Sequence, residues 1–118
     1  NPFAPVAIQA AYNESEDWID ALNLYIHDNF EVLRSFCREH LPKWQVMHSE
    51  GTYLAWVDIS QTGLSADTLA QEIMERAHVK VNSGTLYGSI SGEGYLRINL
   101  ACPRSLLEEA LRRIGEHF

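Results

Sequence analysis

Between Ser15 and Leu41 the chain carries a long apolar stripe at helical spacing, and this stripe constrains the fold more than any other feature. Apolar residues that recur every three to four positions predict a helix with one buried side. The stripe consists of Trp18, Leu22, Tyr25, Ile26, Leu33, Phe36 and Cys37. Ser15 before Glu16 and Asp17 fits a helix start, and Pro42 ends the helix. A helix of roughly 25 residues is about 38 Å long, so we expect it to reach beyond one small core.

The rest of the chain alternates between short strands and helices. Residues 6–12 are expected to form a short helix, and residues 83–94, which hold four of the seven glycines, a loop. Strands are predicted at residues 44–47, 52–59, 79–81 and 95–100, and helices at residues 64–77 and 103–117. This order predicts an α/β (α+β) sandwich, in which a small, mainly antiparallel sheet of about three to four strands is covered by helices on one face.

Size and charge limit the classes of function. A chain of 118 residues has the length of one domain and can bury a core. The formal net charge of −7 argues against general nucleic-acid binding, because phosphates are repelled by an acidic surface. No run of about 18 apolar residues is present, so no membrane span is predicted. Two cysteines without a secretory signal are typical of a cytoplasmic protein.

The first residue is Asn1 rather than methionine, which we interpret as the start of a piece of a longer protein. On this interpretation residues 1–14 are a linker or interdomain segment. Residues 15–118 are then the domain itself.

Arg97 is the first candidate for a binding residue. It lies in a predicted strand of otherwise apolar or β-compatible residues, directly after the glycine-rich loop. A guanidinium can bind a carboxylate through two parallel, charge-assisted hydrogen bonds. The loop has neither the G-x-x-x-x-G-K-[ST] phosphate-binding pattern nor the G-x-G-x-x-G dinucleotide pattern. The alternative is an edge-strand arginine paired with a nearby acid such as Glu93.

No other pattern points to a catalytic or metal centre. The five histidines show no i, i+4 pairing of the H-E-x-x-H kind, so no metal site is expected. Cys102, near a predicted helix start, either has a lowered pKa or is a plain core thiol. Lys43 and Lys80 are the only lysines, and both are interpreted as solvated. A Schiff-base lysine would need desolvation or a cationic neighbour.

Three motifs resemble one enzyme family in their order and spacing. They are Gly51-Thr52-Tyr53-Leu54-Ala55-Trp56-Val57-Asp58, then Val79-Lys80-Val81-Asn82-Ser83-Gly84 with Tyr87-Gly88, then Gly92-Glu93-Gly94-Tyr95-Leu96-Arg97-Ile98-Asn99-Leu100-Ala101-Cys102-Pro103-Arg104. They resemble the C-terminal portion of fold-type-I pyridoxal-phosphate enzymes. The last motif looks especially like that of cystathionine β-lyase-like C–S lyases, which are close to class I/II aminotransferases. The likeness covers nearly the whole chain.

The resemblance implies a role for four residues. Arg97 would bind the α-carboxylate of an amino-acid substrate, and the loop with Gly84, Tyr87 and Gly88 would line the substrate entrance. The parent enzyme would use pyridoxal phosphate, held by a lysine and other ligands in a large domain that this chain lacks. The chain would be the small domain of that fold, inactive alone and without tightly bound cofactor. The parent would be a homodimer.

Several alternatives stay open. Arg97 serves transamination and β-elimination equally, although the last motif favours the lyase. The chain can also be a stand-alone α/β module that binds or senses amino acids, or an interaction module in which Arg97 forms a salt bridge. Exposed apolar side chains on residues 2–12 or on the long helix would favour part of a larger enzyme over a stand-alone module.

Overall fold

The computed structural model describes residues 1–118 and contains four α-helices and one four-stranded sheet. The helices are α1 (Phe3–Glu14), α2 (Glu16–His40), α3 (Ala66–Glu72) and α4 (Arg104–Gly115), and the strands are β1 (Gln45–Val46), β2 (Leu54–Asp58), β3 (Asn82–Ser83) and β4 (Tyr95–Asn99). A π-helical turn at Ile73–Ala77 continues α3, and 3-10 turns lie at Ser60–Thr62 and Gly84–Tyr87.

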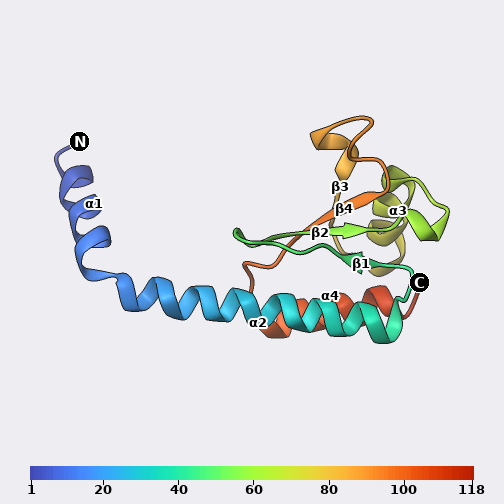
Figure 1. Ribbon diagram of the computed structural model, residues 1–118, viewed down its shortest axis with the longest axis horizontal. Coiled ribbons are helices and arrows are strands. Elements are labelled where there is room, and N and C mark those ends of the chain that lie inside the picture. The colour runs from blue at the N-terminus through green and yellow to red at the C-terminus, as the bar shows by residue number, and fades with distance from the viewer.

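The sheet has the order β1-β2-β4-β3, and every neighbouring pair is antiparallel. Figure 1 shows α2 and α4 running along one side of the sheet, and these two helices contact each other. The termini of the chain lie at opposite ends of the molecule (Figure 1). The expected α+β sandwich with a small antiparallel sheet is therefore confirmed.

The strand expected at residues 79–81 is wrong in its position. The π-helical turn carries the chain on to Ala77, and His78 then adopts a left-handed backbone with φ of 55°. The chain reaches the edge of β4 only at Asn82, so the strand is Asn82–Ser83. Val81 still packs into the core.

The core lies between one face of the sheet and helices α2, α3 and α4. Side chains alternate along a strand, which sends Ala55 and Val57 of β2 and Leu96 and Ile98 of β4 to this face. The helices contribute Phe30, Leu33, Cys37, Leu69, Leu107, Leu111 and Ile114. The opposite face of the sheet, which we call the open face, is left uncovered by these helices.

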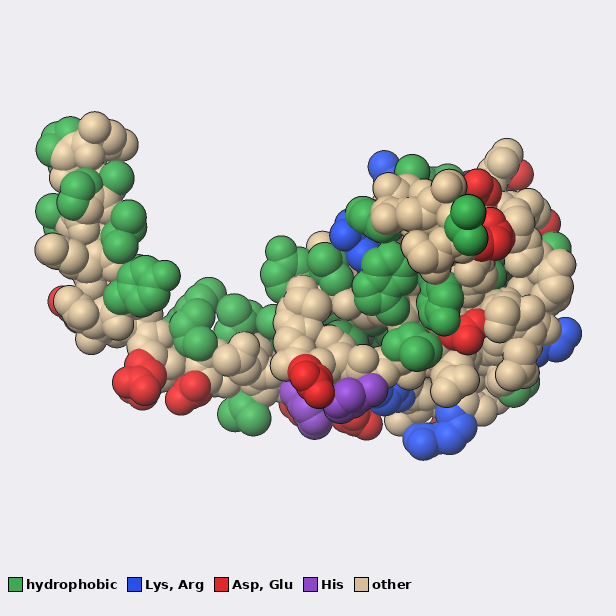
Figure 2. Space-filling view, turned by 45° about the horizontal axis from the view of Figure 1, so that its top comes forward, with side chains coloured by type: hydrophobic (Ala, Val, Ile, Leu, Met, Phe, Trp, Pro, Cys, Tyr) green, Lys and Arg blue, Asp and Glu red, His purple; other side chains and the backbone are tan.

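The predicted long helix is confirmed as α2, but its apolar stripe is buried only in the second half. The buried residues of α2 begin at Asn29, and no residue of α1 is buried. Together α1 and the first part of α2 form an arm, residues 3–24, that projects from the body of the molecule (Figure 1). Apolar side chains lie along this arm (Figure 2), among them Phe3, Val6, Ile8, Tyr12, Trp18, Ile19 and Leu24.

One polar side chain, Asn29, is fully buried where α2 packs against the end of β4. Its Nδ2 donates to the carbonyl oxygens of Leu100 at 2.9 Å and Cys102 at 3.2 Å. Its Oδ1 accepts a hydrogen bond from Nε of Arg104 at 3.0 Å. The Tyr25 hydroxyl, one turn earlier, accepts from the backbone N–H of Arg104 at 2.6 Å. These bonds anchor the segment after β4 onto the long helix.

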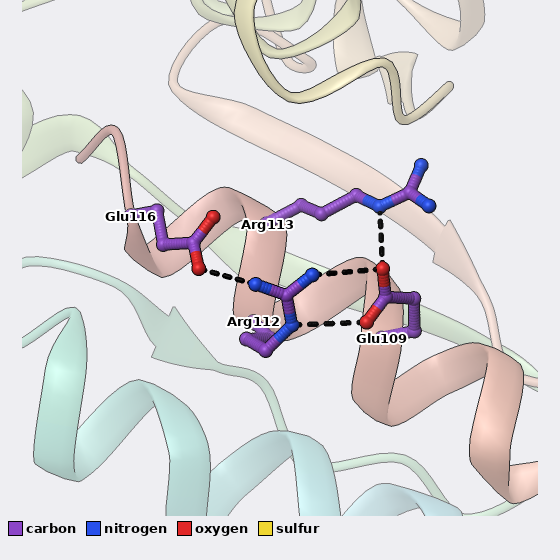
Figure 3. Close-up of polar contacts among 4 residues, drawn as sticks. All are labelled: Glu109, Arg112, Arg113 and Glu116. Atoms are coloured by element: carbon purple, nitrogen blue, oxygen red, sulfur yellow. Dashed lines mark hydrogen bonds and ion pairs between the residues drawn. The ribbon is translucent and has the colours of Figure 1, made fainter.

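On the solvent side of α4, Glu109 lies between two arginines (Figure 3). Its carboxylate accepts two hydrogen bonds from Arg112, both at 2.9 Å, and one from Arg113 at 2.8 Å. Arg112 also donates to Glu116. The hydrogen bonds from Arg112, and then the one from Arg113, lower the pKa of Glu109 from 4.5 to about 2.

This network predicts an acid-sensitive contribution to stability. Because the folded-state pKa of Glu109 is depressed, its contribution is present above the unfolded pKa of 4.5 and disappears as pH falls toward about 2. Glu109→Gln should therefore lower Tm at pH 6, with the difference from wild type vanishing near pH 2. Thermal melts at both pH values check this. The matched control is Glu108→Gln, since Glu108 is exposed and makes no ion pair. An equal Tm difference at both pH values would contradict the prediction.

Candidate functional site

A row of polar and aromatic side chains crosses the open face of the sheet. In the sheet register Arg97 of β4 pairs with Trp56 of β2 on one side and with Asn82 of β3 on the other. Because Leu96 and Ile98 point into the core, the side chain of Arg97 lies on the opposite face. Strand alternation, already visible in the sequence, therefore places the predicted binding residue on the open face.

Arg97 has no acidic partner. Its Nε is a buried donor without a hydrogen-bond partner, and no carboxylate lies within ion-pair distance of its guanidinium. The alternative pairing with Glu93 is wrong, because the Glu93 carboxylate instead accepts from the backbone N–H of Ala66 at 3.0 Å. What does contact the guanidinium is an aromatic ring: its Cζ lies 4.0 Å from the ring centroid of Tyr87.

The glycine-rich loop is closed by direct contact between two glycine backbones. A Cβ added to Gly84 would overlap the carbonyl oxygen of Gly92, and a Cβ added to Gly92 would overlap the carbonyl of Gly84. This close approach explains why glycine is needed at both positions. A Cβ on Gly88 would meet the side chain of Ser91, so Gly88 also lies within the packed part of the loop.

The start of the loop is tied to α3. The Ser83 hydroxyl accepts from the backbone N–H of Thr85 at 3.3 Å, and Oγ1 of Thr85 donates to Asp67 at 2.6 Å. Hydrogen bonds from Ser83 and Thr85 hold the pKa of Asp67 below its usual range. The carboxylate thus stays ionised at neutral pH and holds the turn that carries Tyr87.

A cavity of about 390 Å³ opens beside this loop on the open face. Three of its seven lining residues are aromatic, and none of them is charged. The lining residues are Met47, Trp56, Gly84, Tyr87, Ser91, Gly92 and Tyr95. Of the loop residues predicted to line a site, Gly84 and Tyr87 line this cavity, and Gly88 is not among its lining residues. Trp56, Tyr95 and Asn82 are neighbours of Arg97 that sequence reasoning missed.

The remaining candidate groups form no second centre. No three His, Cys, Asp or Glu side chains gather at one point. Burial raises the pKa of the Cys37 thiol to about 11 and also raises that of Cys102. The alternative of an activated Cys102 is therefore wrong, and the thiol packs against the core. None of the helices combines the length and the apolar character that crossing a membrane requires.

Comparison with known proteins places this chain in a family. No family model matches the chain. Cystathionine β-lyase PatB from Bacillus subtilis is 40% identical over 114 residues, which cover 97% of this chain and 29% of that protein. Protein MalY from Escherichia coli is 35% identical over 104 residues, 86% of this chain and 26% of that protein. This chain is homologous to the C-terminal part of cystathionine β-lyase-like enzymes.

A solved structure gives the same result for the fold. The C–S lyase from Staphylococcus hominis, with pyridoxal phosphate bound, superposes on 98% of this chain with a TM-score of 0.83 and 36% identity. The match covers 30% of that protein. The chain therefore spans less than a third of the length of these relatives, and it corresponds to a small domain of the pyridoxal-phosphate-dependent transferase fold.

Proposed function

We propose that this chain is the small domain of a pyridoxal-phosphate-dependent enzyme and that Arg97 binds the α-carboxylate of its amino-acid substrate. The state of Arg97 carries the proposal. Its guanidinium lies on the open face with no counter-ion, and its Nε is the one buried side-chain donor without a partner. Unsatisfied buried polar groups are rare in folded proteins and require an explanation. A substrate carboxylate would supply the missing charge and acceptor atoms.

The proposed reaction is β-elimination from a sulfur-linked amino acid, with transamination as the second candidate. The names of the two relatives at 40% and 36% identity, a cystathionine β-lyase and a C–S lyase, favour elimination. Pyridoxal phosphate supplies the electron sink for either reaction. The part of Arg97 is to hold the carboxylate and thereby fix the orientation of the Cα bonds. Gly84, Tyr87 and Gly88 would form the wall of the site beside it.

The cofactor does not fit this chain alone. Lys43 and Lys80 both have exposed side chains, unlike a lysine desolvated for Schiff-base chemistry. We therefore place the cofactor lysine and the phosphate ligands in the rest of the full-length enzyme. The isolated chain should bind no cofactor tightly and turn over no substrate.

The exposed apolar side chains of the arm indicate that it binds a partner with a large surface. Phe3 is 80% exposed and Trp18 62%, and many exposed apolar side chains on one segment mark an interaction site. The proposed partner is the large domain of the same enzyme, within a homodimer. The alternative of a stand-alone module gives no reason for this exposure. The two free cysteines, Cys37 and Cys102, agree with the cytoplasmic location that we propose.

The test of this function uses the full-length gene product. Purified protein should be yellow, and its absorption band should shift when amino acids are added. With cystathionine, β-elimination should release thiol, ammonia and pyruvate without a second substrate, whereas transamination would require a keto-acid acceptor. The isolated chain mixed with pyridoxal phosphate serves as the control and should show no shifted band. A full-length protein that stays colourless after addition of pyridoxal phosphate would refute the proposal.

A further inference from the structure

The ring of Tyr87 covers one face of the Arg97 guanidinium, with Cζ 4.0 Å from the ring centroid. The ring is itself held from two directions. Its hydroxyl accepts a hydrogen bond from Nδ2 of Asn82 at 3.0 Å. It also forms an edge-to-face pair with the ring of Trp56, with centroids 5.7 Å apart and an interplanar angle of 84°. Asn82 and Trp56 are the two residues that flank Arg97 in the sheet, so the stack is braced by both neighbouring strands.

The backbone also fixes the place of Tyr87. The contact between Gly84 and Gly92 closes the loop around the 3-10 turn Gly84–Tyr87. Thr85 in this turn is tied to Asp67 of α3. Tyr87 is 48% exposed, so its position over Arg97 does not follow from burial in a core. It follows from a turn that is fixed at its first two residues, Gly84 and Thr85.

We propose that Tyr87 is a positioning residue that orients the Arg97 guanidinium for a carboxylate. This inference rests on the proposed function of Arg97. A ring over the face of a guanidinium leaves its N–H groups free in the plane, where a carboxylate binds with two parallel hydrogen bonds. An arginine side chain has many rotamers, and holding it in one of them before the substrate arrives removes that loss of entropy from binding. Tyr87 thus acts on the carboxylate through Arg97.

The experiment compares two ligands on the full-length holoenzyme. One is an amino acid, and the other is the amine that remains after its carboxylate is removed. Affinities are measured by the absorption change of the bound cofactor. Tyr87→Leu should lower the affinity for the amino acid by about 3- to 30-fold, the range expected for loss of a cation–π contact. The affinity for the amine, which has no carboxylate, should change by less than about twofold. Leu86→Ala, a change in an exposed neighbour of the same turn, should alter neither affinity.

Two milder variants test the hydrogen bond between Asn82 and Tyr87. Tyr87→Phe removes the hydroxyl and Asn82→Ala removes the amide that donates to it, so both delete the same hydrogen bond. Each should lower the affinity for the amino acid by about two- to fivefold. The double variant should show no lower affinity than either single variant. These variants keep the stacked ring and therefore remain informative if Tyr87→Leu does not fold.

The outcomes separate this inference from the proposed function. Equal weakening of amino acid and amine in Tyr87→Leu would show a general structural role and overturn the inference. An unchanged amino-acid affinity would overturn it as well. If Arg97→Ala still binds the amino acid more tightly than the amine by the wild-type ratio, the proposed function of Arg97 is refuted, independently of the results for the Tyr87 variants.

Discussion

Arg97→Ala in the full-length enzyme should lower kcat/KM for cystathionine by about 30- to 5,000-fold, which corresponds to about 2–5 kcal/mol for truncating one partner of a buried charge pair. The substrate carboxylate would lose both of its hydrogen bonds and its counter-ion. The Nε of Arg97 has no partner within this chain, so the variant leaves no other group of the chain unsatisfied. The bound cofactor and its absorption band should be retained.

The controls for this prediction separate charge from geometry. Arg38→Ala removes an equal charge from the exposed side of α2, where the one side-chain hydrogen bond of Arg38 goes to Ser35, and should leave kcat/KM within about twofold. Arg97→Lys keeps the charge but loses the planar pair of donors, and should recover only part of the activity. If Arg97→Ala retains kcat/KM within about threefold of wild type, the carboxylate lies elsewhere.

Asn29→Ala should destabilise the chain by about 2–4 kcal/mol, because the donors and acceptors it leaves behind are buried or partly buried. Two carbonyl oxygens, those of Leu100 and Cys102, would lose their donor, and Nε of Arg104 would lose its acceptor. Removal of a fully buried side chain also leaves a cavity. Urea unfolding followed by tryptophan fluorescence measures the change in the free energy of unfolding.

The control is a second asparagine on the same helix. Asn23 is exposed on the arm, and Asn23→Ala should change the free energy of unfolding by less than about 0.5 kcal/mol. The m-value should stay the same in both variants, since the surface exposed on unfolding is unchanged. A loss below about 0.5 kcal/mol in Asn29→Ala would show that water replaces its hydrogen bonds.

The placement of Arg97 could be predicted because it depends on local rules. Leu96 and Ile98 fix which side of the strand faces the core, and alternation sends Arg97 to the other side. Its neighbours could not be predicted in the same way. Trp56 comes from β2, which β3 separates from β4 along the chain, and Asn82 lies in β3, whose position was predicted wrongly. Only the pairing β2-β4-β3 brings both residues beside Arg97.

Tyr87 lay further out of reach of sequence reasoning. The loop could be recognised by its glycines, but its shape depends on the contact between Gly84 and Gly92, eight positions apart. A flexible connector and a closed turn have the same composition. The misplaced strand has a similar cause, since nothing in the sequence marks the π-helical turn that carries the helix on to Ala77.

The position of Asn29 in the sequence indicates that its side chain is buried. It follows Ile26 by three positions and precedes Leu33 by four, so it occupies the apolar stripe of the long helix. A polar residue at a buried position of a helix predicts a hydrogen-bonded role in the core. Its hydrogen-bond partners could not be predicted, because the carbonyls of Leu100 and Cys102 lie 71 and 73 residues further along the chain.

The short outer strands have a consequence for how the molecule behaves at high concentration. β1 and β3, at the two edges of the sheet, each pair with their neighbour over two residues. A strand from another molecule needs a run of unpaired N–H and C=O groups to add to an edge, and these edges offer very few. The aromatic open face can therefore remain uncovered for a ligand without giving the sheet a template for fibril growth.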